Sequence, residues 1–486
     1  MLLKVSIRVD LGRDLGQNFG SLFEAADAVG NVVAGAGYLG AHNTDVRSDR
    51  RILNFFIKPK TPVAEPSVER LPRANDDAGV YLHTFTDRVL ARSRGGARDR
   101  KVRYWDEAQG KWVVDVATPG LAIHLGNRVL ATSPRGVAFD GRSVLELGPD
   151  QGSIGETYYA NGVFVYREHD RKRSPFLNRL VACPWDPIED GSIDLQRAEI
   201  LELRTDTEFA YGCGQLGRKV LITTNTGGIY EFSAEGWRVL LEPDSNTSFQ
   251  IYSAINYYDR LLFGQYPTGE QWEYDGNDLR LLKGWPPVMN GVSKRAREAQ
   301  TAAIYGGELY VGVWPWAEVW RYDRNTAAWT FVHRMFTHPE LHEDPTHPYE
   351  TEMRQLDGVW NDWGQRVTSL VPYREALYVG TSSKGGSPYE PKFQFLADGR
   401  WEDYGAIYRY TVPGHLSVYT EWCDGPTAFD FVLTGDRMTV SQDGKEIGSA
   451  DLPPGLAEQI AAADVAWGSG VYGAFRGEIL DHSLSN

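Results

Sequence analysis

Two histidines and a tyrosine pair are the residues of this sequence best suited to proton transfer. His83, His124 and the pair Tyr158–Tyr159 each stand just before a short turn that is followed by an apolar run. Imidazole titrates near neutral pH, and a tyrosine beside a cation can act first as a base and then as an acid. Each histidine taken singly fits an ordinary core position, whereas equivalent positions in successive repeats favour one shared site.

The same position can be followed through seven similar segments of the chain. Aligned on the turn, it is occupied by His83, His124, Tyr158, Gln215, Asn256, Ile304 and Val371. The first five are polar and the last two apolar, so the alignment predicts that polar side chains gather on one side of the structure. A slip of one residue would instead place Tyr159, Leu216 and Tyr257 there, because neighbouring residues of a strand face opposite ways.

These segments belong to a repeat that predicts the fold. Each is a hairpin followed by a second hairpin, such as 102–114 or 319–332, in which an aromatic strand, a turn and another strand succeed one another. Two hairpins in a period of roughly 40 residues match a propeller blade. We therefore expect an all-β protein with a seven-bladed β-propeller over 76–411, in which the first strand of each blade lines a central channel.

Two flanking segments complete the predicted organisation. Residues 1–75 form an N-terminal β segment that could complete a blade, and residues 412–486 form a C-terminal β accessory segment.

Charge and composition limit the partners. The formal net charge of −15 argues against nucleic acid and against anionic membranes. A local group of arginine and histidine can still make a positive cleft, so an acidic oligosaccharide or polysaccharide stays open as a partner. The three cysteines are far apart and predict free thiols. With neither a signal peptide nor a long apolar run in view, we expect a cytoplasmic protein, or a secreted or periplasmic one if a leader precedes the sequence.

With His83, His124 and Tyr158 or Tyr159 in three successive repeats, the sequence resembles the seven-bladed propeller polysaccharide lyases of the ulvan lyase and rhamnose–glucuronate lyase type. The resemblance implies β-elimination beside a glucuronic acid. A histidine or arginine neutralises the carboxylate, a tyrosine or histidine removes the C5 proton, and a protonated side chain helps O4 to leave. It implies that the histidines lie near the carboxylate or act as base, and that Tyr158 or Tyr159 is proton donor and acceptor.

The remaining expected site residues are a cation and a set of binders. The cation could come from Arg103, Arg128, Arg204 or Arg218, and the expected substrate-binding residues are Asn161, Arg204, Tyr211, Gln215 and Asn256. Two other functions stay open, a non-catalytic propeller that binds carbohydrate or protein and a propeller glycoside hydrolase. No paired-carboxylate pattern and no G-x-S-x-G motif can be placed.

A histidine-rich segment, HPELHEDPTHPYE at 338–350, could bind a divalent metal such as calcium or zinc, although no cofactor is required by the reasoning above. Its candidate ligands are His338, His342, Glu343 and His347; its alternative is a solvated polar loop. Nearby tryptophans could stack on sugars or simply pack between blades. They are Trp314, Trp316, Trp360 and Trp363.

Overall fold

The computed structural model of the chain describes residues 3–12, 18–42, 48–93, 101–116, 122–244, 249–356, 362–385 and 389–485. Over these residues the fold is all-β, as predicted, with the short helix α1 (Pro348–Gln355) and a few 3₁₀ turns. The 3₁₀ turns are Leu195–Arg197, Gln394–Leu396, Arg400–Asp403 and Ala457–Gln459. No helix in the described part of the chain has the length and apolar character needed to cross a membrane.

Seven antiparallel sheets follow one another along the middle of the chain, and at least three strands of each succeed one another in sequence. The first is β7 (Val80–Thr84), β8 (Val89–Ser93), β9 (Arg103–Asp106) and β10 (Lys111–Val114); the second is β11 (Ala122–Leu125), β12 (Arg128–Ser133), β13 (Gly136–Phe139) and β14 (Arg142–Glu146). The third is β15 (Ser153–Ala160), β16 (Val163–Asp170), β17 (Leu177–Pro184) and β18 (Glu199–Glu202). The fourth is β19 (Ala210–Leu216), β20 (Lys219–Thr224), β21 (Ile229–Ser233) and β22 (Gly236–Leu241).

The last three sheets follow the same order, and two of them recruit a strand from the N-terminal segment. The fifth is β23 (Gln250–Tyr257), β24 (Arg260–Tyr266), β25 (Gln271–Tyr274) and β26 (Leu279–Leu282), with β4 (Ala41–His42) added beside β23. The sixth is β27 (Glu298–Tyr305), β28 (Glu308–Trp314), β29 (Glu318–Asp323) and β30 (Ala328–Arg334). The seventh is β31 (Gln365–Tyr373), β32 (Ala376–Ser383) and β33 (Ile407–Thr411), and its outer strand is β6 (Ser67–Leu71).

The first strands of these sheets lie toward one another, as the inner strands of a β-propeller do. β19 contacts β23, β23 contacts β27, β27 contacts β31, and β31 contacts β7. Short turns connect each first strand to the second; between β15 and β16 the turn is Asn161–Gly162, where both residues have positive φ (56° and 68°). Such a turn matches the twist of the strands, which is why Asn-Gly is favoured there.

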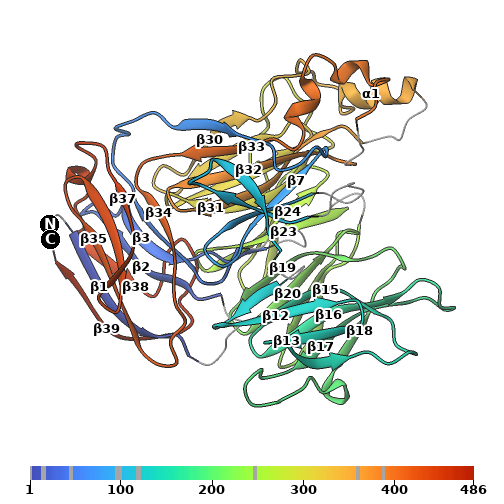
Figure 1. Ribbon diagram of the computed structural model, residues 1–486, viewed down its shortest axis with the longest axis horizontal. Helices are drawn as coiled ribbons and strands as arrows, with labels where there is room; N and C mark the ends of the chain where they lie inside the picture. Colours follow the sequence, from blue (N-terminus) through green and yellow to red (C-terminus); the bar gives the residue numbers. More distant parts are fainter. Residues whose placement is uncertain are drawn as a thin grey trace.

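The two ends of the chain combine into one terminal module of two sheets (Figure 1, left). One sheet is β37 (Lys445–Asp451), β36 (Arg437–Gln442), β35 (Thr427–Leu433), β1 (Leu3–Asp10) and β39 (Glu478–Ser485). The other is β34 (His415–Tyr419), β5 (Ile52–Ile57), β3 (Val32–Tyr38), β2 (Gly20–Ala26) and β38 (Asp464–Trp467). Burial alternates along β1 and β35, as expected for sheets with one face on a core. The two flanks, expected as separate segments, thus share every sheet of this module.

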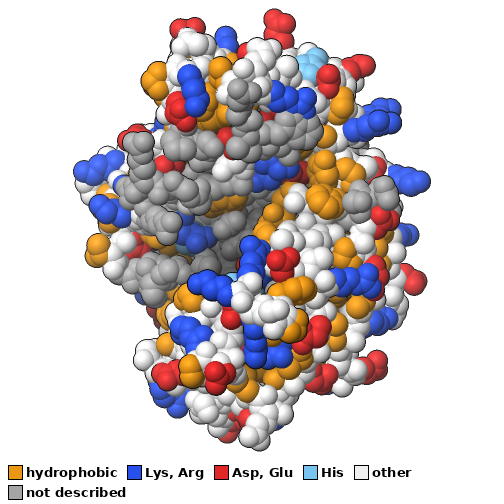
Figure 2. All heavy atoms as spheres, turned by 90° about the vertical axis from the view of Figure 1, so that its right-hand side faces the viewer, with side chains coloured by type: hydrophobic (Ala, Val, Ile, Leu, Met, Phe, Trp, Pro, Cys, Tyr) orange, Lys and Arg blue, Asp and Glu red, His pale blue; other side chains and the backbone are white. Residues whose placement is uncertain are grey.

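A segment of the terminal module enters the space between the seven sheets. After β3 the chain leaves the module and forms β4, in which His42 pairs with Ala254 and Ala41 with Ile255 of β23. It then returns through Asp49 and Arg50 to β5. Figure 2 views the face opposite the terminal module and shows a hollow at its centre, with lysine and arginine side chains and hydrophobic side chains on its wall.

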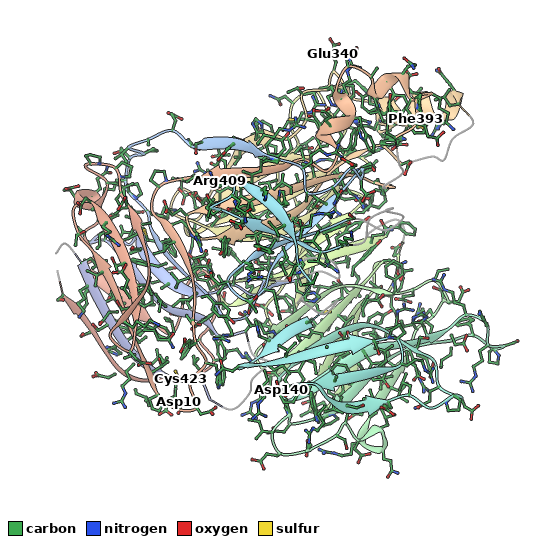
Figure 3. The ribbon with its side chains drawn as sticks, in the orientation of Figure 1. Asp10, Asp140, Glu340, Phe393, Arg409 and Cys423 are labelled. Atoms are coloured by element: carbon green, nitrogen blue, oxygen red, sulfur yellow. The ribbon has the colours of Figure 1, made fainter. Side chains whose placement is uncertain are left out.

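An insertion between the sixth and seventh sheets carries α1. Its residues pack into a core of aromatic rings, in which Trp363 lies 5.4 Å from Phe393 between ring centroids and is fully buried. Figure 3 labels Phe393 and Glu340 in this part of the molecule.

Candidate ligand site in the central channel

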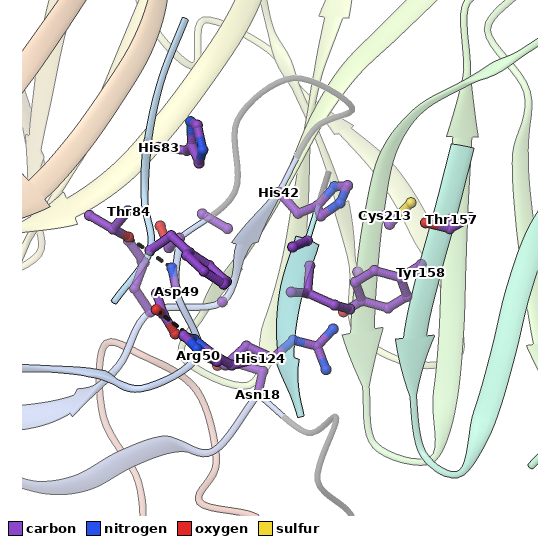
Figure 4. A pocket seen from close by; sticks show the side chains of 18 of the residues that line it. Asn18, His42, Asp49, Arg50, His83, Thr84, His124, Thr157, Tyr158 and Cys213 are labelled. Atoms are coloured by element: carbon purple, nitrogen blue, oxygen red, sulfur yellow. Dashed lines mark hydrogen bonds and ion pairs between the residues drawn. The ribbon is translucent and has the colours of Figure 1, made fainter. Parts of the chain in front are cut away.

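The described residues line a cavity of about 60 Å³, with both polar and apolar groups on its wall, between the inner strands and the inserted segment (Figure 4). The inner strands contribute His83, His124, Tyr158 and Asn256, four of the residues expected from the alignment. The inserted segment contributes three more polar groups, His42, Asp49 and Arg50. Cavities of this size hold a small polar group and a few water molecules.

His124 is held by a buried carboxylate. Its Nδ1 lies 2.9 Å from Asp49 Oδ2, and the two side chains are only 4% and 0% exposed. The ring of Phe85 stacks on the imidazole, with centroids 4.3 Å apart and planes inclined by 1°. Because a carboxylate only accepts, Nδ1 carries the hydrogen, and Nε2 is the nitrogen that can act as a base.

The backbone fixes Asp49 in turn. The N–H of Thr86 donates to Oδ2 at 3.0 Å, and the N–H of Arg51 donates to Oδ1 at 3.1 Å. The N–H of Asp49 donates to Thr84 Oγ1 at 2.8 Å. A carboxylate with three donors on its two oxygens is locked in one orientation, and it therefore orients His124.

Arg50 is one of two arginines, with Arg92, among the described residues that line the cavity. Its guanidinium carbon lies 5.3 Å from the centre of the Tyr158 ring, and the His42 ring lies 5.4 Å from the same ring at an angle of 84°. Arg50 Nη1 is buried and has no hydrogen-bond partner within the described part of the chain. Leaving a buried charged donor unmatched costs at least about 1–3 kcal/mol, so the geometry favours an anion beside it.

An amide network forms the wall of the cavity on the side of the terminal module. Asn18 Nδ2 donates to Asn256 Oδ1 at 3.0 Å, Asn18 N–H donates to Gln215 Oε1 at 3.0 Å, and Gln215 Nε2 donates to Asn161 Oδ1 at 2.6 Å. A Cβ on Gly40 would lie 1.9 Å from Asn18 Nδ2, so this wall requires glycine at that position. Beyond the wall lies a wider groove of about 850 Å³.

Other predicted site residues lie away from the cavity. Tyr159 is buried in the core, where its hydroxyl donates to the Trp185 carbonyl at 3.0 Å, so Tyr158 is the member of the pair that lines the cavity. Arg204 lies beyond the outer strand β18, is 61% exposed, and pairs with Glu242 at 2.6 Å. Tyr211 lies near the start of β19, whereas Gln215 lies near its end and belongs to the amide network.

The histidine-rich insertion does not assemble a ligand set. Within the described ranges no three His, Cys, Asp or Glu side chains are placed to hold a metal. His338 bonds Tyr349 at 2.7 Å and Asp403 at 3.1 Å, using both ring nitrogens. His347 accepts from the Tyr349 N–H at 3.3 Å at the start of α1, and burial together with Arg334 holds its pKa well below the ordinary value.

The other two members of that expected set, Glu343 and His342, differ: Glu343 is exposed, and His342 makes a local hydrogen bond. His342 Nδ1 accepts from the Asp344 N–H at 3.0 Å. Glu350, a residue that the metal hypothesis did not include, accepts backbone N–H bonds from residues 362–364. His338, His347 and Glu350 thus stabilise the fold of the insertion, whereas residues 341 and 343–345 are exposed, as expected for a polar loop.

The four tryptophans have different environments. Trp316 and Trp363 are 2% and 0% exposed and pack in the insertion, which excludes them as sugar platforms in this conformation. Trp314 is also buried but lies beneath the Lys384 ammonium, 4.2 Å from the ring centre. Trp360 falls outside the described residues.

Sequence reasoning missed the inserted segment. Residues 41–51, AHNTDVRSDRR, form a polar run between two apolar strands and are indistinguishable from a surface loop in the sequence. Only their density of charged and imidazole groups could have drawn attention to His42, Asp49 and Arg50.

Comparisons with known proteins give a fold likeness at low similarity. No family model and no curated protein matches the chain. The computationally designed Ika8 protein is 13% identical, covers 70% of this chain and 98% of its own, and has a TM-score of 0.37. The β-propeller domain of Cps50 (Swd1) from Myceliophteria thermophila is 12% identical over 71% and 99% of the two chains, with a TM-score of 0.37.

A third solved structure, described as YCF48 bound to D1 peptide, is 8% identical over 73% and 99% of the two chains, with a TM-score of 0.36. The WD40 repeats of RRP9 are 10% identical with a TM-score of 0.37. None of these four proteins is described as a polysaccharide lyase. Their likeness is too distant to assign a ligand or a reaction.

Proposed function

We propose that the seven sheets are the blades of one propeller and that its central channel binds the carboxylate of an acidic ligand, with an acidic oligosaccharide as the best chemical fit. The observation that carries the proposal is the buried Arg50 Nη1, which lacks a partner in the described part of the chain and lies in a cavity. A carboxylate would satisfy that donor through a charge-assisted hydrogen bond.

The charge balance of the cavity supports an anion. Its lining includes the guanidinium groups of Arg50 and Arg92 and the imidazoles of His42, His83 and His124. Asp49 is the one carboxylate among the described lining residues, and it is engaged by His124. The protein as a whole carries a formal charge of −15, so this is a local positive site of the kind that selects an acidic partner.

The size of the cavity supports an end group and not a whole saccharide. A space of about 60 Å³ accommodates a carboxylate with a few waters. Hydroxyl and amide groups from Tyr158, Thr157 and Asn256 line it as well, which suits a ligand rich in hydroxyls. The rest of such a ligand would extend along the channel.

The test is a calorimetric titration with a glucuronate-containing oligosaccharide and with a neutral oligosaccharide of the same length. We expect binding of the acidic ligand only, and a loss of at least about thirtyfold in affinity for Arg50→Gln, because removing one partner of a buried charged pair costs 2 kcal/mol or more. Arg204→Gln is the matched control and should bind like the wild type. Equal binding of both ligands, or equal effects of the two substitutions, would contradict the proposal.

A second candidate is β-elimination, favoured by an oriented imidazole, His124, and a phenol, Tyr158, that line the same cavity. In that reaction Arg50 neutralises the uronate carboxylate, and His124 Nε2 or the Tyr158 oxygen takes the C5 proton. The electron pair of the C5–H bond forms the C4–C5 double bond, and the C4–O4 bond breaks as O4 accepts a proton from an acidic side chain.

Ultraviolet absorbance of the unsaturated uronate separates the two candidates. A lyase should produce one double bond for each new reducing end, and His124→Gln and Tyr158→Phe should each slow this strongly. Retained binding with no absorbance change on any acidic glycan leaves a non-catalytic binding propeller. Reducing ends without the double bond would indicate hydrolysis.

A further inference from the structure

A second polar cluster lies at the other end of the inner strands. It comprises Tyr211 on β19, Tyr252 on β23, Glu298 on β27 and Arg366 on β31, with Lys384 directly after β32. Arg366 Nη2 lies 2.7 Å from Glu298 Oε2, and Lys384 is bonded to the other oxygen of the same carboxylate. These residues stand at or next to the starts of their strands, whereas Gln215 and Asn256 stand near the ends.

This cluster carries a net positive charge. Glu298 is fully buried, Arg366 is 5% exposed and Lys384 is 16% exposed, so two cations share one carboxylate. These cations hold the pKa of Glu298 down at about 2 despite its burial, so the carboxylate stays ionised. One positive charge therefore remains, in a setting where electrostatic interactions are stronger than in water.

Aromatic rings border the same charges. Tyr211 and Tyr252 stack with centroids 4.9 Å apart and planes inclined by 20°, and Lys384 lies 5.4 Å from the Tyr266 ring centre. Tyr252 is buried, whereas Tyr211 and Tyr266 remain partly exposed. Ring faces next to a cation suit the apolar faces and the acidic groups of a sugar chain.

The position of the cluster relates it to the cavity. The ends of β19 and β23 touch Asn18 of the terminal module, so the starts of these strands lie toward the opposite face, where Figure 2 shows the central hollow. From Tyr211 to Gln215 the strand advances by four residues, or about 13 Å. Cys213, between them, lines the cavity.

We propose that Tyr211, Tyr252 and the Arg366–Glu298–Lys384 group form a second subsite of the same channel, so that the protein selects acidic oligomers over acidic monomers. This inference rests on the proposed function, because the cavity at Arg50 holds one end of the ligand. A single sugar unit reaches only the cavity, whereas a longer chain also reaches the Tyr211 ring.

The experiment is a calorimetric comparison of glucuronate with glucuronate-containing oligosaccharides of increasing length. We expect wild-type affinity to rise with length. Tyr211→Ala should lower the affinity for the longest ligand by about tenfold and leave the monosaccharide unchanged, since one ring contact is worth about 1 kcal/mol or somewhat more. Tyr211→Phe should keep the gain with length, and Tyr389→Ala, at an exposed tyrosine between β32 and β33, is the matched control.

The outcomes separate the two proposals. One outcome overturns the second subsite and leaves the proposed function standing. In it, Arg50→Gln lowers the affinity for every acidic ligand, whereas Tyr211→Ala lowers no affinity more than the control Tyr389→Ala does. If wild-type affinity is the same for all lengths, the second subsite is likewise overturned. If no acidic ligand binds at all, both proposals fail. Circular dichroism and thermal unfolding of each variant show whether it folds.

Discussion

Replacing Asp49 by asparagine exchanges a double acceptor for a group with one acceptor and one donor. In the native structure Oδ2 accepts from Thr86 N–H and from His124 Nδ1, while Oδ1 accepts from Arg51 N–H. In either orientation of the introduced amide, its NH₂ group must face at least one of these donors. Asp49→Asn therefore removes at least one hydrogen bond to a charged acceptor and leaves a buried donor unmatched.

The magnitude follows from the burial of the pair. A hydrogen bond to a charged group contributes about 1.5–3 kcal/mol, and an unmatched buried donor costs about 1–3 kcal/mol. We expect Asp49→Asn to lower the free energy of unfolding by about 3 kcal/mol, which is roughly a hundredfold in the folding equilibrium. Affinity for the acidic ligand should fall as well, because His124 and the neighbouring Arg50 lose their fixed placement.

Urea unfolding followed by tryptophan fluorescence measures the effect, with Asp443→Asn as the control. Asp443 likewise accepts hydrogen bonds, from Ala428 N–H at 2.8 Å, Thr427 Oγ1 at 2.9 Å and Cys423 Sγ at 3.9 Å, but it is exposed. Its substitution should cost less than about 1 kcal/mol. Equal losses for the two variants, or unchanged ligand affinity in Asp49→Asn, would refute the reasoning.

Three further outcomes are expected. Burial holds the pKa of His415 at about 3, so its contribution to stability is complete above the unfolded pKa of about 6.5 and is lost as the pH falls from there toward 3. The wild type should lose about 2 kcal/mol of unfolding free energy from this group between pH 7.5 and 5. The difference in unfolding free energy between the wild type and His415→Asn should shrink by that amount. Urea unfolding at the two pH values measures this difference, and a constant difference would contradict the prediction. Glu298→Gln leaves Arg366 and Lys384 without their carboxylate and should lower the free energy of unfolding by about 3–5 kcal/mol, measured by thermal unfolding. Adding Arg366→Met should recover part of this stability. If Glu298→Gln alone left stability unchanged, the pair would not be buried in solution. Gly40→Ala should cost about 1–3 kcal/mol by displacing Asn18 and Asn256, and an unchanged melting temperature would mean that this wall is not closed.

The local sequence pattern predicted much of the fold, because in a hairpin with a short turn the type and length of the turn set the pairing register of the two strands. The turn-based alignment placed His83, His124, Tyr158 and Asn256 at equivalent positions, and the structure brings all four to one cavity. The tyrosine pair was left open since a one-residue slip inverts a strand, and the Trp185 carbonyl contact places Tyr159 in the core.

Long-range placement could not be predicted in the same way. Asp49 reaches His124 across 75 residues because a segment of the terminal module runs between the sheets, and no local pattern reports such a path. The histidines of 338–350 show the opposite error. Their residue types are those of metal ligands, but Tyr349, Asp403 and the start of α1 engage His338 and His347 instead. Residue type indicates the chemistry available, whereas only the neighbours decide which use is made of it.

The central claim is that the channel cavity receives a carboxylate at Arg50. The most direct measurement is a crystal structure of the protein with a glucuronate-containing oligosaccharide. The account predicts density in the cavity with a carboxylate oxygen within hydrogen-bond distance of Arg50 Nη1 and with the chain extending toward Tyr211. Ligand density only outside the channel, with no ligand atom in the cavity, would contradict it.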